Sequence, residues 1–151
     1  MEENIALSGL SANSIDTFFE LKDKDARSFS PLTLAYIGDA VYEIVIRTII
    51  VEKGNAPVNK LHHRASSFAK AAAQREALER ILPILTDEEE AVYKRGRNAK
   101  SYTSAKNASI IDYRIATGFE ALIGFLYLEG RNERLLELVK AGIDEKLDKN
   151  V

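Results

Sequence analysis

The sequence predicts an all-α protein with six or seven helices packed into one domain. A chain of 151 residues is long enough for one domain with a proper hydrophobic core. Its 46% hydrophobic and 29% charged residues are typical of soluble globular proteins. Only three prolines and eight glycines are present, which leaves little room for the turns of an all-β fold. Apolar residues instead recur at helical spacing, and this periodicity favours helices.

The first long helix has its own start and stop signals. Residues 1–29 form a polar lead-in with at most one short helix. Ser30 can cap the helix that follows, and Pro31 is tolerated at a first helical position. Gly54 is expected to end this helix. Because its apolar residues lie nearly all the way round, we expect this helix to be the buried centre of the domain.

The later helices are bounded in the same way. A helical pattern over residues 58–82 ends at Pro83, and a break is expected near residues 66–67, two serines whose hydroxyls compete for backbone partners. A capping box at residues 86–89 starts another helix, which Gly96 should stop. A long polar loop should follow, because no periodicity is visible there. The last two helices are expected over residues 113–129 and from Asn132 onward.

Composition excludes several classes of protein. The absence of cysteine rules out disulfides, thiolate metal sites and cysteine nucleophiles. No apolar run is long enough to span a bilayer, and the first twenty residues lack the pattern of a signal peptide. We therefore expect a cytoplasmic protein without a membrane segment. Its domain should occupy residues 30–147, between the lead-in at residues 1–29 and a tail at residues 148–151.

The charge is unevenly distributed although the net charge is only -2. Four acids stand together at residues 87–90, whereas the stretch from Lys94 to Lys106 holds five bases and no acid. This asymmetry is typical of a local contact with phosphate. A solvated charged loop is the alternative explanation. The candidate RNA-contacting residues are Lys94, Arg95, Arg97, Asn98, Lys100 and Lys106.

Two acids stand within the two most apolar helical segments, Asp39 in the first and Glu120 in the second. A buried carboxylate without a partner is unstable, so either its pKa rises or a partner supplies positive charge. That partner is either a base such as Arg47 or Arg114 that pairs with each acid, or a cation that the two acids share. Magnesium suits the second arrangement, because it prefers oxygen ligands and is commonly bound by one or two carboxylates with substrate phosphate. The small residues near the two acids (Gly38, Thr117 and Gly124) serve an open site and close helix packing equally well.

Three segments resemble a known family. The segment LAYIGDAVYE at residues 34–43 resembles the signature helix of the ribonuclease III endonuclease domain, and FEALIGFLYL at residues 119–128 resembles its second acidic helix. The segment RGRNAK at residues 95–100 is similar to one in Mini-ribonuclease III, the branch that lacks a double-stranded-RNA-binding domain. The likeness extends from about Pro31 to Ile143. Too few residues follow the second motif here for a further domain.

The resemblance implies a helical homodimer that cleaves double-stranded RNA and leaves 5′-phosphate ends. It assigns catalysis and Mg²⁺ binding to Asp39 and Glu120, with Mn²⁺ as a substitute metal. Glu43 would be a supporting residue behind the metal ligands, although its spacing to Arg47 equally predicts an ordinary surface ion pair. The implied substrate is a precursor of large-subunit ribosomal RNA, and a ribosomal protein on that RNA would assist binding.

The sequence departs from the family at two positions. The family has further acids four residues before the signature aspartate and three before the second glutamate, and these positions are Ala35 and Thr117 here. We therefore expect weak metal binding by the free protein. The missing acids also support an alternative, a non-catalytic module that holds structured RNA in a ribosomal particle. A third hypothesis, a helical protein-interaction domain, leaves the basic stretch unexplained.

Overall fold

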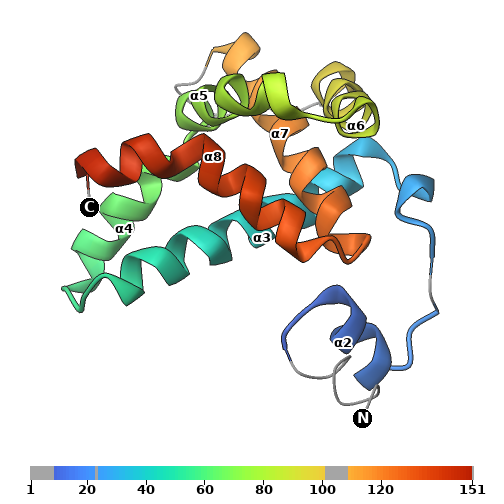
Figure 1. Ribbon diagram of the computed structural model, residues 1–151, viewed down its shortest axis with the longest axis horizontal. Helices are drawn as coiled ribbons and strands as arrows, with labels where there is room; N and C mark the ends of the chain where they lie inside the picture. The colour runs from blue at the N-terminus through green and yellow to red at the C-terminus, as the bar shows by residue number, and fades with distance from the viewer. Residues whose placement is uncertain (1–8, 23, 101–108, 151) are drawn as a thin grey trace.

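The computed structural model describes residues 9–22, 24–100 and 109–150, with the side chain of the last residue left out, and these residues form helices without strands. This confirms the predicted all-α class. Seven α-helices are present in the described ranges, and two short 3₁₀ helices, η1 and η2, join them (Figure 1). Their bounds are α2 Ala12–Phe18, η1 Ala26–Ser28, α3 Pro31–Glu52, α4 Val58–Ala69, α5 Ala71–Ile81, η2 Leu82–Ile84, α6 Asp87–Asn98, α7 Ile110–Leu128 and α8 Asn132–Asn150.

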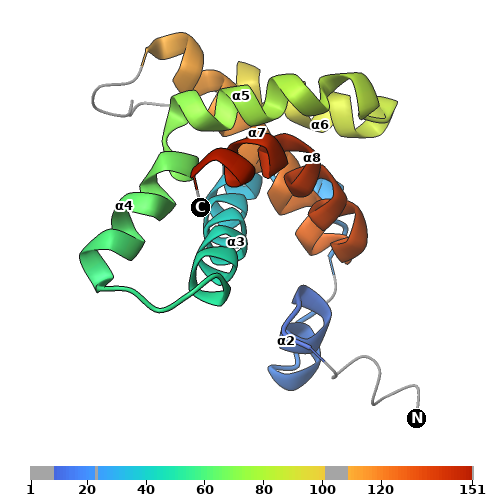
Figure 2. The same cartoon turned by 60° about the vertical axis from the view of Figure 1, so that its left-hand side comes forward.

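Helix α7 is the centre of the fold. It runs through the middle of the bundle in both views, with α3, α5 and α6 around it (Figures 1 and 2). Its residues from Ala116 to Leu126 are buried, apart from Glu120, which is half-buried. The prediction that the first long helix is the centre was therefore wrong. Helix α3 buries one face against α7 and leaves another in solvent, where Tyr36 is 82% exposed and Ile44 57% exposed.

The local signals for helix starts were confirmed. The Ser30 hydroxyl accepts a hydrogen bond from the Thr33 backbone N–H at 3.3 Å, which caps α3. In the capping box of α6, the Glu89 backbone N–H donates to the Thr86 hydroxyl at 3.2 Å, and the Thr86 backbone N–H donates to the Glu89 carboxylate at 2.9 Å. Gly54 follows α3 with φ +148°, a conformation that glycine adopts without strain.

Three predicted helix boundaries need correction. The break in the 58–82 stretch lies at Lys70, whose extended backbone separates α4 from α5, and not at the serine pair. Gly96 does not stop α6, which continues to Asn98. A Cβ on Gly96 would meet Ala121 Cβ at 2.7 Å, so this glycine allows α6 to pack closely on α7. Helix α7 begins at Ile110, three residues earlier than predicted, and most of the predicted polar loop, residues 101–108, lies outside the described residues. Helix α8 continues to Asn150.

The segment before α3 is anchored to the body by Arg27 in η1. Its Nε donates a hydrogen bond to Glu88 at 3.0 Å, and one of its terminal nitrogens lies 3.3 Å from Glu129. The guanidinium group also lies over the ring of Phe125, 5.6 Å from the ring centre. Within the described ranges, no helix is long and apolar enough to cross a membrane.

Candidate active site

Two glycines bring the predicted metal ligands together where α3 crosses α7. Gly38 precedes Asp39 on α3, and a Cβ added to it would lie 1.8 Å from the backbone oxygen of Glu120 on α7. A Cβ on Gly124, one turn after Glu120, would lie 2.0 Å from the backbone oxygen of Leu34. The two helices therefore touch through their backbones next to the acid pair. The small residues serve close packing, which was one of the two roles predicted for them.

The two carboxyl groups meet at the edge of this crossing. Asp39 is exposed, whereas Glu120 is half-buried. Burial raises the pKa of Glu120 to about 8, with further contributions from the charge of Asp39 and a hydrogen bond between the two side chains. The pair therefore carries less negative charge near neutral pH than two ordinary carboxylates would. A cation bound between them would reverse this effect.

No base compensates the two acids. Within the described ranges, no lysine, arginine or histidine forms an ion pair with Asp39 or Glu120. Arg47, one of the bases considered from the sequence, pairs instead with Glu43 at 2.7 Å. Glu43 thus makes the surface ion pair that its spacing predicts. The described residues therefore provide no structural ion pair for either acid.

The two positions where the family has further acids carry no ligand here. Ala35 is buried and apolar. The Thr117 hydroxyl donates a hydrogen bond to the backbone oxygen of Tyr113 at 2.9 Å, one turn earlier in the same helix. No group of three or more acidic, histidine or cysteine side chains is placed to hold a metal among the described residues. The site therefore consists of two acids.

Polar side chains from α3, α5 and α8 converge on the end of α4, close to Glu120. Three consecutive backbone oxygens there each accept a side-chain hydrogen bond: Ser67 from Lys146, Phe68 from Tyr42 and Ala69 from Gln74. Carbonyls at a helix end have no partner within the helix, so side chains commonly satisfy them. Burial, and then the charge of Glu120, raise the pKa of the Tyr42 phenol above its ordinary value.

Gln74 connects this helix end directly to the acid pair. Its side-chain Nε2 donates to the backbone oxygen of Ala69 at 2.9 Å and to the Glu120 carboxylate at 3.2 Å. The residue is only 2% exposed. Sequence analysis missed Gln74, because an amide in an alanine-rich helix gives no local signal. One indication was available: it is the one uncharged polar residue in the run KAAAQREALER.

The predicted RNA-contacting residues lie at the end of α6 and just beyond it. Lys94 pairs with Glu90 at 2.7 Å, and the Arg97 guanidinium lies 5.5 Å from the ring centre of Tyr93. Arg97 also donates to the Asn98 side-chain oxygen at 3.1 Å. Arg95 and Lys100 are exposed. Lys106 lies outside the described residues. The first four of the predicted residues thus belong to the last turns of a helix, not to a loop.

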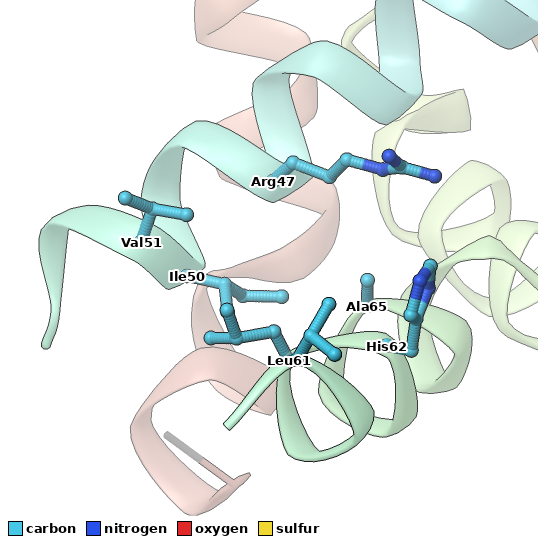
Figure 3. Close-up of a pocket in the computed structure, with 7 residues that line it drawn as sticks. Arg47, Ile50, Val51, Leu61, His62 and Ala65 are labelled. Carbon is cyan, nitrogen blue, oxygen red and sulfur yellow. The ribbon is translucent and has the colours of Figure 1, made fainter. Parts of the chain in front are cut away.

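A second basic segment escaped the sequence analysis. Between Glu52 and Glu76 the chain contains no acid, and it contains five lysines or arginines and both histidines. This segment includes α4, and the absence of acids was the signal that could have found it. Helix α4 and the end of α3 enclose a small pocket with an apolar lining. Figure 3 shows Arg47 and His62 at one end of this pocket, which gives that end a basic rim.

Comparison with known proteins identifies close relatives. Residues 32–131, which include both acids, match the family described as the Ribonuclease III domain. A Mini-ribonuclease 3 from Clostridium tetani is 55% identical over 126 residues, covering 83% of each chain. Another from Enterococcus faecalis is 49% identical over 118 residues, covering 77% of this chain and 89% of that protein. The fold is similar to a crystal structure of a Fusobacterium nucleatum protein, with a TM-score of 0.73 and 28% identity, covering 82% of this chain and 98% of that one.

Proposed function

The chain belongs to the ribonuclease III family, in its Mini-ribonuclease 3 branch, and is an endoribonuclease; from this premise we propose that it cleaves double-stranded RNA with Mg²⁺ held by Asp39 and Glu120. The observation that carries the proposal is the uncompensated pair of carboxyl groups at the crossing of α3 and α7. Two adjacent carboxyl groups without a base resist ionising together, and a bound cation would stabilise both in their ionised form.

The residues present fit a hard divalent cation. Mg²⁺ is commonly held by one or two carboxylates, keeps several waters and completes its ligand shell with substrate phosphate. Asp39 and Glu120 supply the two carboxylates, and the absence of further acids at Ala35 and Thr117 leaves the remaining ligands to water and RNA. Free protein should therefore bind Mg²⁺ weakly and bind it more tightly with RNA. Mn²⁺ prefers similar oxygen ligands and should substitute.

The reaction is hydrolysis of a phosphodiester. A water oxygen bonds to phosphorus, the bond to the 3′-oxygen breaks, and the products carry a 5′-phosphate and a 3′-hydroxyl. A bound divalent cation supplies a more acidic water and neutralises charge on the scissile phosphate. Asp39 and Glu120 would hold the cation beside the scissile phosphate. Glu43 stays paired with Arg47 one turn from Asp39, where it supports the local structure of α3.

The duplex has two strands, so two sites are needed to cleave both at once. The exposed apolar residues of α3 (Leu32, Tyr36, Ile44 and Val51) are spaced to share a helix face, as a subunit interface requires. An apolar groove between α3 and α8, lined by Ile44 and Leu136 among others, continues this surface. A homodimer formed through α3 would place one site on each strand, because its twofold axis can match that of the duplex.

RNA would be bound by its backbone and shape. The bases at the end of α6, with Asn98, have the composition of a phosphate-contacting surface, and the acid-free segment that includes α4 provides a second one. A-form RNA hides its major groove from side chains, so recognition depends mainly on phosphates and 2′-hydroxyl groups. By likeness to the family, the natural substrate is a precursor of large-subunit ribosomal RNA in the cytoplasm, with a ribosomal protein on the RNA aiding binding.

The test is cleavage of an end-labelled RNA duplex with Mg²⁺ or with EDTA. Wild-type protein should cut both strands only with Mg²⁺, and Asp39→Asn and Glu120→Gln should each abolish cutting. Glu145→Gln on α8, an exposed acid paired with Lys149, is the matched control and should cut normally. Undiminished cutting by a folded Asp39→Asn protein would refute the proposal. Retarded but intact RNA in every lane would also refute it and would support a non-catalytic RNA-binding module.

A further inference from the structure

We propose that Gln74 is a positioning residue for Glu120, whose carboxylate it holds in the orientation that binds the divalent cation. The inference rests on the proposed function, since it concerns the same pair of acids. It starts from one nitrogen atom. Gln74 Nε2 lies 2.9 Å from the Ala69 backbone oxygen and 3.2 Å from Glu120 Oε2, so it joins the end of α4 to the acid on α7.

The orientation of the Gln74 amide follows from its neighbours. The Ala69 oxygen is a backbone carbonyl and can only accept a hydrogen bond, so the amide atom that faces it must be the nitrogen. An amide nitrogen has two hydrogens. Here one is directed to Ala69 and the other to Glu120. The backbone at the joint between α4 and α5 therefore fixes the direction of the bond that Glu120 receives.

Fold stability accounts for only one of the two bonds that this amide donates, the bond that satisfies the Ala69 carbonyl at the end of α4. Gln74 is 2% exposed, and its oxygen Oε1 is buried without a hydrogen-bond donor among the described residues. A buried acceptor without a donor lowers stability, whereas an apolar side chain of the same length would avoid that loss. The second donor of the amide is therefore explained by its bond to Glu120 and not by packing.

The small number of acids gives this bond its importance. With two carboxylates in the site, each must present its oxygens correctly, because no further acid can compensate for a misplaced one. A donor on one carboxylate oxygen restricts rotation of the group and favours its ionised form. Partners of this kind behind a metal ligand typically change metal affinity or activity 10- to 100-fold when they are removed.

The test uses Gln74→Met, which removes both donors and keeps the length of the side chain. Two quantities are measured: the Mg²⁺ concentration that gives half-maximal cleavage at saturating RNA, and the rise in Tm that added Mn²⁺ produces without RNA. We expect about 10-fold or more Mg²⁺ to be required and a correspondingly smaller rise in Tm. The Tm in EDTA should fall because the Ala69 carbonyl loses its donor, so the rise in Tm with Mn²⁺ is measured from the Tm of the same protein in EDTA. The KM for RNA should be unchanged.

The control is Leu78→Val, which loosens the packing of α5 one turn after Gln74 and keeps the Gln74 amide in place. It should leave the Mg²⁺ requirement unchanged. A folded Gln74→Met protein with the wild-type Mg²⁺ requirement and Mn²⁺ response would overturn the proposal. If Gln74→Met does not fold, Gln74→Asn replaces it, since the shorter amide cannot reach both acceptors, and the same two measurements decide. A wild-type protein that shows no Mg²⁺-dependent cleavage would instead defeat the proposed function.

Discussion

Replacement of Gly38 by alanine tests whether the glycine crossing creates the active site. The added Cβ would lie 1.8 Å from the Glu120 backbone oxygen and 2.8 Å from the Gly124 backbone nitrogen, whereas real Cβ atoms essentially never approach within 3.0 Å. Both neighbours are backbone atoms, so no side chain can turn aside. Helices α3 and α7 must therefore separate by at least about 1 Å, because a packed interior has no room to absorb the methyl group.

The expected effects follow from this separation. Overpacking of a core costs about 1–3 kcal/mol, and the better helix propensity of alanine recovers up to about 1 kcal/mol. We expect a net loss of about 2 kcal/mol, which lowers Tm by roughly 4–8 °C for a chain of this length. Activity should fall much further. A shift of about 1 Å between Asp39 and Glu120 should reduce the cleavage rate about 100-fold at temperatures where the variant is folded.

The assay combines thermal unfolding with cleavage of a labelled RNA duplex. Gly142→Ala on α8 is the control, because its Cβ would meet the Ala77 Cβ at 3.0 Å, a contact that a small shift relieves. That variant should cut at the wild-type rate. A Gly38→Ala protein with wild-type Tm and wild-type cleavage would show that the close backbone contact does not position the acids.

Four further changes test other parts of the argument. Glu89→Ala should lower the free energy of unfolding, measured in urea, by about 2–4 kcal/mol, because it breaks the buried ion pair with Arg134 at 2.8 Å. The ion pair lowers the pKa of Glu89 from 4.5, so its contribution to stability should be full above pH 4.5 and should be lost as the pH falls further. In EDTA, the Tm of the wild type should fall as the pH rises from 4.5 towards 8, because the pKa of Glu120 is raised in the folded state. Glu120→Gln should abolish this fall in Tm. Tyr36→Glu should yield monomers in sedimentation, because it places a charge on the apolar face of α3. Arg95→Glu combined with Arg97→Glu should weaken binding to duplex RNA at least about 10-fold and reduce its salt dependence.

Each of these predictions has a contradicting result. Unchanged urea unfolding of the Glu89 variant would mean that its ion pair is not a stabilising contact. Parallel pH dependence of Tm in wild type and Glu120→Gln would show that the carboxyl pair carries no strain without a cation. Wild-type protein that sediments only as a monomer at micromolar concentration would refute the α3 interface. Unchanged RNA affinity in the double arginine variant would move the binding surface away from α6.

The helix starts could be predicted from the sequence, because neighbouring residues determine them. The caps at Ser30 and Thr86 depend on side chains and backbone a few residues apart, so they could be found without the fold. Gly96 could not be interpreted in this way. It looks like a helix stop, but its role is set by Gly118 and Ala121 on another helix.

The central helix was also beyond reach from sequence. Helices α3 and α7 are both apolar nearly all round, and only tertiary packing leaves Tyr36 in solvent while it buries Phe119. The acid pair at Asp39 and Glu120 was accessible because acids in apolar helices are chemically conspicuous. Gln74 was not, because its importance depends on the carbonyl of Ala69 and the carboxylate that it joins.

The crossing at Gly38 also has a consequence during synthesis of the protein. Asp39 and Glu120 are separated by about 80 residues, and the helices that carry them meet only when the intervening chain has folded back on itself. Asp39 leaves the ribosome well before Glu120 has been translated. A nascent or truncated chain therefore holds only one of the two acids. The carboxyl pair is assembled late in folding, so a chain still being translated does not present it.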